Sequence, residues 1–249
     1  MIADAYNETI TSLKEQMENN RKMTELLALA QTKQLESQFN PHFLYNTLEN
    51  IRYMCRLEPE TAERMVFSLS KLLRYSLDGS REQVTLKEDL GHLNNYLSIL
   101  EKRFGSRFEY KINVEQECMQ CLIPRLVLQP MIENSVKYGL RPKEGGNGVV
   151  AIRGEIQEAF LELTIMDNGV GMSEERLRYI QKLLEDETEK CQEEESSGIG
   201  IKNVYERIKL IFGEEYRIEI SSFENIGTIV KYRLPVTRAG EQEREKEYV

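Results

Sequence analysis

The sequence predicts a helical hairpin that forms a dimeric four-helix bundle, followed by a two-layer α/β sandwich. Residues 43–55 and 61–77 carry apolar side chains at helical spacing, and Glu58-Pro59 separates the two stretches. One hairpin cannot bury both apolar stripes, so we expect two copies to pair as a homodimer. After Gly79, alternating apolar and polar stretches are mixed with helical patterns, which is typical of a sheet with helices on one face.

Composition narrows the possible functions. The 249 residues carry a net charge of -9 and no basic stripe, which argues against direct nucleic-acid binding. No run of 18 apolar residues and no signal-peptide pattern occurs, so the chain as given is expected to be a soluble cytosolic polypeptide. The four cysteines are too scattered for a disulfide scaffold. Cys118 and Cys121 form a lone CxxC pair, for which two thiols are favoured over a zinc site.

Residues 1–38 contain no proline and no glycine, and Ile10, Leu13 and Met17 follow an approximate heptad. Polar residues such as Gln31 at core-type positions weaken the repeat, so we expect a marginal coiled coil or long helix. A connector that carries a signal and a plain solvated helix both remain open.

The hairpin is assigned to residues 39–80 and contains one of only two histidines, His42. At 100° per residue, His42 falls opposite the apolar arc that includes Phe43 and Thr47, and therefore points to water. Asn46 lies one turn further on the same polar side. The segment alone does not separate a reactive histidine from an ordinary surface histidine.

The sandwich is assigned to residues 81–236, and a charged tail at 237–249 is expected to be disordered. A helix over 86–103 carries His92, which we interpret as a surface or packing residue outside any polar cluster. The predicted strands are Phe108–Val114, Val149–Ile156, Leu161–Met166, Arg217–Ser221 and Thr228–Leu234. Further helices are predicted at Pro124–Tyr138, Ser173–Leu184 and Ile199–Phe212.

The helix that ends near Gly139 carries the first group of candidate binding residues. Asn134, Lys137 and Tyr138 are spaced i, i+3 and i+4 and should share a helix face. An amide oxygen can ligate Mg²⁺, and an ammonium and a phenol can contact phosphates or a ribose.

Two glycine-containing segments complete the set. Asp167 ends a predicted strand, where its carboxylate can accept from an exocyclic amine, and Gly169 and Gly171 let backbone approach a flat ring. Gly198 and Gly200 open a predicted helix, whose free N–H groups can bind an anion. Taken singly, each segment is weak evidence, since an Asp after a strand is more often a turn residue.

Taken in order, these segments resemble the cytoplasmic half of a sensor histidine kinase of the LytS/YesM type, from about Gln34 to Leu234. The segment 40–46, Asn-Pro-His-Phe-Leu-Tyr-Asn, resembles the phosphoacceptor box of that group. The segments 130–134, 167–171 and 198–201 resemble the N, G1 and G2 boxes of the GHKL ATP-binding fold. Gly227-Thr228 is similar to the last glycine-containing motif.

The resemblance implies a fold, a chemistry and partners. His42 would be phosphorylated from Mg-ATP and would pass the phosphoryl group to an Asp of a response regulator receiver domain. Asn134 would bind Mg²⁺, Asp167 would hold the adenine amine, and Thr228 would contribute to nucleotide binding. The chain would be the cytoplasmic portion of a membrane sensor protein, with a HAMP-like connector and a transmembrane sensor upstream.

Two departures from the family pattern leave the general base open. Phe43 replaces the acid that follows the phosphoacceptor in many other groups, and Pro130 replaces an Asn that often opens the N box. Glu133 and Glu49 are the candidate bases. The acidic segment 185–195 between the glycine motifs is either a lid or a solvated charge run.

Two further functions are kept as alternatives. One is a GHKL-fold ATPase without histidine transfer, and the other is a nucleotide-binding dimeric scaffold.

Overall fold

The computed structural model describes residues 41–78, 81–140, 147–185 and 199–238, and the chain divides into two compact units, Met1–Ala62 and Glu63–Val249. The predicted helix over 1–38, Gly198 and almost all of the segment 185–195 lie outside the described residues. Thr237 and Arg238, the first residues of the predicted tail, are described and pair with Leu122 and Cys121.

The first helix, α2, spans Pro41–Leu57 and opens on a proline, which suits a first helical position because its missing N–H has no partner there anyway. Phe43, Thr47 and Ile51 are buried, and His42 is exposed, as the helical pattern predicts. Leu48 is 55% exposed although the pattern places it on the buried arc. One chain therefore leaves this position uncovered, and its burial by a second hairpin stays a prediction.

The second helix, α3, spans Pro59–Leu77 and begins two residues earlier than predicted. Met65, Leu69 and Leu72 are buried, as expected from their spacing, whereas Val66 and Leu77 are exposed. A paired arrangement was predicted because one hairpin cannot bury both apolar stripes, and these exposed positions lie on those stripes. They remain uncovered in one copy.

The second unit is built on a five-stranded sheet with the order β2-β4-β5-β7-β6. Its strands are β2 (Phe108–Val114), β4 (Gly148–Gln157), β5 (Phe160–Asp167), β6 (Arg217–Phe223) and β7 (Gly227–Pro235). The pair β2 and β4 is parallel, and every other pair in this sheet is antiparallel. All five strands of the sheet were predicted from the alternation of apolar residues.

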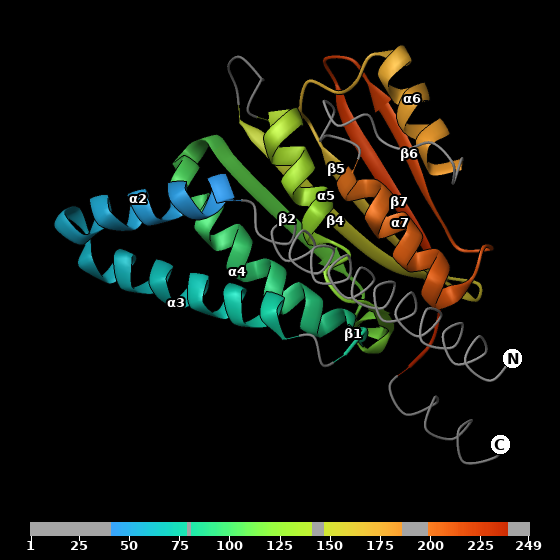
Figure 1. Cartoon of the computed structure of the whole chain (residues 1–249), viewed down its shortest axis with the longest axis horizontal. Coiled ribbons are helices and arrows are strands. Elements are labelled where there is room, and N and C mark those ends of the chain that lie inside the picture. The colour runs from blue at the N-terminus through green and yellow to red at the C-terminus, as the bar shows by residue number, and fades with distance from the viewer. Residues whose placement is uncertain (1–40, 79–80, 141–146, 186–198, 239–249) are drawn as a thin grey trace, which may run out of the picture. The chain divides into compact units, whose positions relative to one another are not determined.

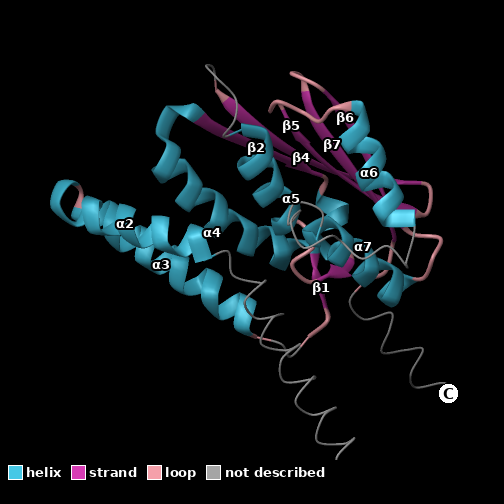
Figure 2. Cartoon of the chain, turned by 45° about the horizontal axis from the view of Figure 1, so that its top comes forward, coloured by secondary structure: helices cyan, strands magenta, loops and turns pink. Residues whose placement is uncertain are grey.

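Four helices cover one face of this sheet, which confirms the predicted two-layer sandwich (Figures 1 and 2). They are α4 (Leu86–Phe104), α5 (Gln129–Asn134), α6 (Glu174–Glu185) and α7 (Ile199–Phe212). Residues alternate between buried and exposed along β6, as expected when only one sheet face is covered. Tyr232 and Leu163 are fully buried beneath the helices.

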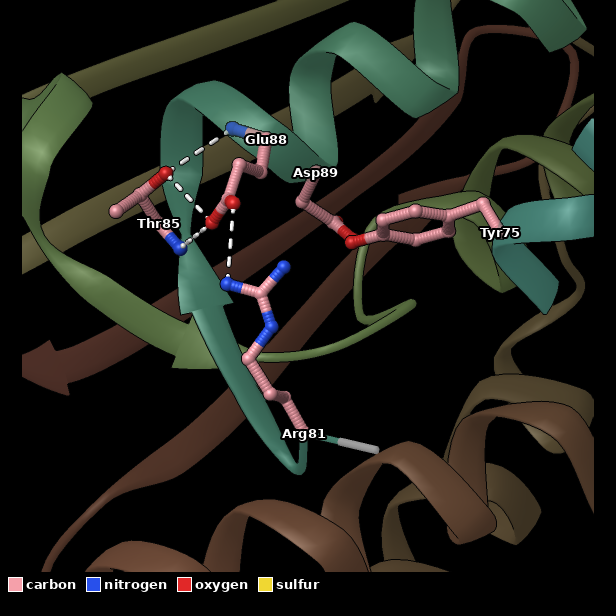
Figure 3. A network of polar contacts seen from close by, with 5 residues as sticks. All are labelled: Tyr75, Arg81, Thr85, Glu88 and Asp89. Atoms are coloured by element: carbon pink, nitrogen blue, oxygen red, sulfur yellow. Dashed lines mark hydrogen bonds and ion pairs between the residues drawn. The ribbon is translucent and has the colours of Figure 1, made fainter. Parts of the chain in front are cut away.

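Helix α4 begins at a capping box. The Thr85 hydroxyl accepts from the Glu88 backbone N–H at 3.2 Å, and the Glu88 carboxylate accepts from the Thr85 N–H at 2.9 Å (Figure 3). Arg81 forms an ion pair with the same carboxylate at 3.3 Å. These contacts fix where the sandwich starts, because they satisfy donors that a helix N-terminus otherwise leaves free.

The predicted single helix over Pro124–Tyr138 is wrong in its first half. Residues Leu122–Pro124 form strand β3, which pairs antiparallel with β1 (Gln83–Thr85), and a turn follows in which Leu126 has φ +57°. Helix α5 starts at Gln129 because Pro130 is tolerated only in a first helical turn. From Ser135 to Leu140 the helix continues with π geometry.

Candidate functional site

A cavity of about 340 Å³ lies at the end of the sheet where β5, β7 and α5 meet. Five of the predicted site residues line it: Asn134, Tyr138, Asp167, Gly171 and Thr228. The remaining wall is largely apolar and includes Met131, Ile201 and Ile220. A cavity with apolar walls and a few polar groups is suited to a flat ring with polar edges.

Asp167 is held rigidly at this cavity. It is the last residue of β5, and the Ser135 hydroxyl donates to its Oδ2 at 2.7 Å while the Gly169 N–H donates to its Oδ1 at 2.9 Å. Ser135 was not singled out in the sequence. The feature that could have indicated Ser135 is its position directly after Asn134, because a hydroxyl there can reach the Asp167 carboxylate. Two donors fix the carboxylate in one orientation, so that it can accept from a ligand amine.

The glycines around Asp167 are required by close backbone contacts. A Cβ on Gly171, which has φ +65°, would lie 2.0 Å from the Phe223 carbonyl oxygen. A Cβ on Gly169 would lie 2.5 Å from the Gly139 backbone. The loop after β5 therefore packs directly on the π turn Ser135–Leu140 that follows α5 and on the β6–β7 hairpin. Any larger residue at Gly171 would push this loop out of place.

Thr228 belongs to a small hydroxyl network at the cavity. Its hydroxyl lies 2.9 Å from the Ser222 hydroxyl, and Ser222 accepts from the Met172 N–H at 2.9 Å. These contacts join the start of β7 to the loop after Gly171. Arg176 on α6 also lines the cavity and was not predicted, although it is a basic residue shortly after the glycine motif.

Some predicted site residues do not line the cavity. Lys137 is exposed and donates to the Tyr138 hydroxyl at 2.7 Å. The predicted shared face assumed α-helical spacing, and the π turn at Ser135–Leu140 changes that spacing. Glu133 lies beside Asn134 on the helix, outside the lining.

Gly169 and Gly200 also lie next to the lining residues rather than among them. A Cβ on Gly200 would be 3.9 Å from the Asn134 amide nitrogen, which places this helix start beside the metal-ligand candidate.

Asn134 is the residue that fits a magnesium ion. Mg²⁺ is bound in nucleotide sites by one or two protein oxygens together with phosphate oxygens and water, so a single amide oxygen in the cavity suits it. The described residues contain no group of three or more His, Cys, Asp or Glu side chains that could hold a metal ion.

The candidate histidine lies on α2, in the other unit. His42 is exposed, and the Asn46 amide donates to the His42 backbone carbonyl. This hydrogen bond links the Asn46 side chain to the backbone of the helical turn that carries His42. Glu49, a candidate base, forms an exposed ion pair with Arg52 at 2.7 Å.

Comparisons with known proteins agree with the motifs and the fold. The family "Histidine kinase" matches residues 30–108, and the family "Histidine kinase-, DNA gyrase B-, and HSP90-like ATPase" matches residues 122–238. The Sensor protein kinase HptS of Staphylococcus aureus strain bovine RF122 / ET3-1 is 33% identical over 208 residues, which are 84% of this chain and 39% of that protein. The same protein from strain USA300 matches with the same identity and coverage. The chain therefore belongs to the histidine kinase family of two-component signalling proteins, and it spans 39% of the length of these relatives.

Solved structures of histidine kinases are similar at low sequence identity. The histidine kinase domain of the Erythrobacter litoralis EL346 blue-light activated kinase is 16% identical, with a TM-score of 0.44 over 82% of this chain and 92% of that chain. The mycobacterial sensor histidine kinase MprB is 18% identical, with a TM-score of 0.43 over 64% of this chain and 99% of that chain. No helix among the described residues has the length and apolar character that a membrane span needs.

Proposed function

We propose that this chain is the cytoplasmic kinase portion of a LytS/YesM-type sensor, and that it phosphorylates His42 from Mg-ATP bound in the cavity at Asp167. The observation that carries the proposal is the Asp167 carboxylate, which two donors orient at a largely apolar cavity of about 340 Å³. The exposed position of His42 leaves its ring accessible to a phosphoryl donor.

The proposed reaction is an in-line displacement. A ring nitrogen of His42 attacks the γ-phosphorus of ATP, the bond to the bridging oxygen breaks, and ADP leaves. A neutral imidazole is already a competent nucleophile near neutral pH, so positioning and charge neutralisation supply most of the catalysis. Mg²⁺ held by Asn134 would neutralise phosphate charge as the bond to ADP breaks.

Glu133 is the proposed acceptor of the proton that the attacking ring loses. Burial raises the pKa of Glu133 above the usual range of a glutamate, and the Gln129 amide and the nearby Lys137 oppose that rise. A raised pKa brings a carboxylate closer to the pH at which a general base works best. Glu49 fits less well, because it is exposed and already paired with Arg52.

The proposed product, a phosphohistidine, is a phosphoramidate that can pass its phosphoryl group to an Asp of a response regulator receiver domain. We propose that residues 39–80 form the phosphoacceptor and dimerisation hairpin, 81–236 the ATP-binding domain, 1–38 a HAMP-like connector, and 237–249 a tail. The uncovered apolar side chains of α2 and α3, such as Leu48 and Val66, support pairing of two hairpins.

The test separates a histidine kinase from an ATPase that does not modify itself. The purified chain is incubated with γ-labelled Mg-ATP, and both phosphoprotein and free phosphate are measured. We expect acid-labile phosphoprotein that is absent from His42→Gln, with nucleotide affinity unchanged in that variant. Free phosphate with no phosphoprotein would overturn the proposal in favour of a plain ATPase. Nucleotide binding with neither phosphoprotein nor free phosphate would favour a nucleotide-binding scaffold, and failure to bind any adenine nucleotide would favour a dimeric scaffold that binds a partner through the helical hairpin.

A further inference from the structure

A buried polar cluster lies between the end of α3, helix α4 and the start of α5, away from the cavity lining. His92 and Asp89 on α4 are 4% and 1% exposed, and both face residues that precede or open α5. Tyr75, in the last turn of α3, donates to Asp89 at 3.2 Å. Figure 3 shows the Tyr75 and Asp89 side chains pointing toward each other. The Tyr75 ring also stacks on His92 with 4.2 Å between centroids and lies 4.2 Å from the Arg125 guanidinium.

From this cluster a chain of hydrogen bonds runs to Glu133. His92 Nε2 lies 2.6 Å from Gln129 Oε1, and Gln129 Nε2 donates to Glu133 Oε1 at 2.7 Å. An ionised carboxylate can only accept, so Gln129 must present its nitrogen to Glu133 and its oxygen to His92. His92 is therefore a donor through Nε2.

The second member of the cluster fixes the turn before α5. The Asp89 carboxylate accepts from the Leu126 N–H at 2.9 Å, where the backbone has φ +57°. A leucine in the left-handed region persists only when its surroundings hold it there. Asp89 and His92 are spaced i and i+3 on α4, so one helix face orients both the turn and the first residue of α5.

We propose that His92 and Gln129 are positioning residues for the kinase reaction: they hold the Glu133 carboxylate in one orientation beside Asn134, and the Tyr75 ring holds His92. This inference rests on the proposed function, because it assigns a purpose to the orientation of Glu133. Tyr75 belongs to α3, the second helix of the proposed phosphoacceptor hairpin. Helix α3 therefore contacts His92, one of the residues that orient Glu133, directly.

The test compares two variants that break the chain of hydrogen bonds with one that keeps it. His92→Leu and Gln129→Met leave the cavity lining intact and free the Glu133 carboxylate to rotate. Gln129→Met loses one hydrogen bond to a charged group and should lower kcat for His42 phosphorylation roughly tenfold, and His92→Leu, which removes the hydrogen bond that holds Gln129, should lower kcat by a similar factor. The Kd for ATP should stay within about twofold in both variants. His92→Gln keeps a hydrogen-bond donor near the position of Nε2 and should therefore retain most of the wild-type kcat. The double variant should be no slower than either single variant, because both act through the same carboxylate.

Gln157→Met is the matched control. Gln157 donates to the Glu155 carboxylate at 2.7 Å on the exposed end of β4. This variant therefore breaks a hydrogen bond of the same type and length at a distant exposed position, and kcat should stay unchanged. Rates are normalised to the fraction of chains that bind ATP, which removes any loss through misfolding.

The outcomes are distinguishable. If His92→Leu and Gln129→Met keep normal kcat in chains that bind ATP, or if His92→Gln fails to restore it, the inference is overturned and the proposed function stands. A wild-type chain that forms no phosphohistidine overturns the proposed function and this inference with it.

Discussion

Replacing His92 by glutamine should change how the stability of the ATP-binding unit depends on pH. His92 is 4% exposed, and its Nδ1 has no hydrogen-bond partner among the residues that the structure describes. Burial lowers the pKa of His92 from 6.5 to about 4, and the nearby Arg125 charge lowers it further, while the Gln129 hydrogen bond opposes the shift. The imidazole is thus neutral in the folded chain at a pH where it is charged in the unfolded chain.

Proton linkage gives the sign and the size of this change in unfolding free energy with pH. A histidine with a depressed folded pKa contributes stability that is present above its unfolded pKa and is lost as the pH falls toward the folded value. Between about pH 7 and pH 5 that loss is about 2 kcal/mol. Glutamine does not titrate, so His92→Gln should lack this loss. The difference in unfolding free energy, wild type minus variant, should grow by about 2 kcal/mol from about pH 5 to about pH 7.

A buried carboxyl group acts in the opposite direction in the same range. Burial raises the pKa of Asp89 from 3.8 to about 6, against the hydrogen bonds from the Leu126 and Leu128 backbone and from Tyr75. The stability linked to this raised pKa is present below the unfolded value and is lost as the pH rises through about 6. In wild type the two slopes oppose each other, and the variant should keep the Asp89 slope and lose the His92 slope.

Urea unfolding followed by circular dichroism, at several pH values between about 5 and 7, measures the difference directly. Comparing wild type with His92→Gln cancels the titration of groups that do not interact with His92. Parallel stability profiles, with a difference that stays constant within about 0.5 kcal/mol, would refute the buried neutral histidine.

The remaining predictions concern the cavity and the hairpin. Gly171→Ala should weaken ATP binding at least roughly tenfold in calorimetry, because its Cβ would lie 2.0 Å from the Phe223 carbonyl oxygen. Gly91→Ala is the control, since its Cβ would have no atom within 4 Å. This control should bind ATP normally, and its free energy of unfolding in urea should rise by about 0.5–1 kcal/mol. Asn134→Ala should abolish the effect of adding Mg²⁺ on ATP affinity, and an EDTA-treated wild type should behave like the variant; a magnesium effect that persists would exclude Asn134 as the ligand. Leu48→Glu should shift the chain from dimer to monomer in sedimentation, since Leu48 is 55% exposed in one copy, and a variant that stays dimeric would place the interface elsewhere.

The sequence predicts the regular elements well where periodicity is strong. All five strands of the main sheet and the helix Ile199–Phe212 were recovered, because alternation and helical spacing are local signals. The strands β1 and β3 were missed because each has only three residues, too few for a period to show. The turn at Leu126 was missed because its conformation is held by Asp89, which is distant in sequence.

The predicted residues lie together where a motif fixes both residue and position. Asn134, Asp167, Gly171 and Thr228 meet at one cavity, as the ordered motifs implied. Lys137 does not line the cavity, since the predicted helix face assumed an α turn and a π turn cannot be distinguished from it by pattern alone.

His92 was wrongly interpreted as lying outside any polar cluster. Its partners Tyr75 and Gln129 lie 17 and 37 residues away in the chain, so only the fold brings them together.

The most direct test of the account is to locate the transferred phosphoryl group. The chain is incubated with Mg-ATP labelled at either the α or the γ position, digested at neutral to basic pH, and mapped by mass spectrometry. We expect label from the γ position only, on the peptide that contains His42, and none on any peptide of His42→Gln. Phosphate on another residue, or undiminished label in His42→Gln, would contradict it.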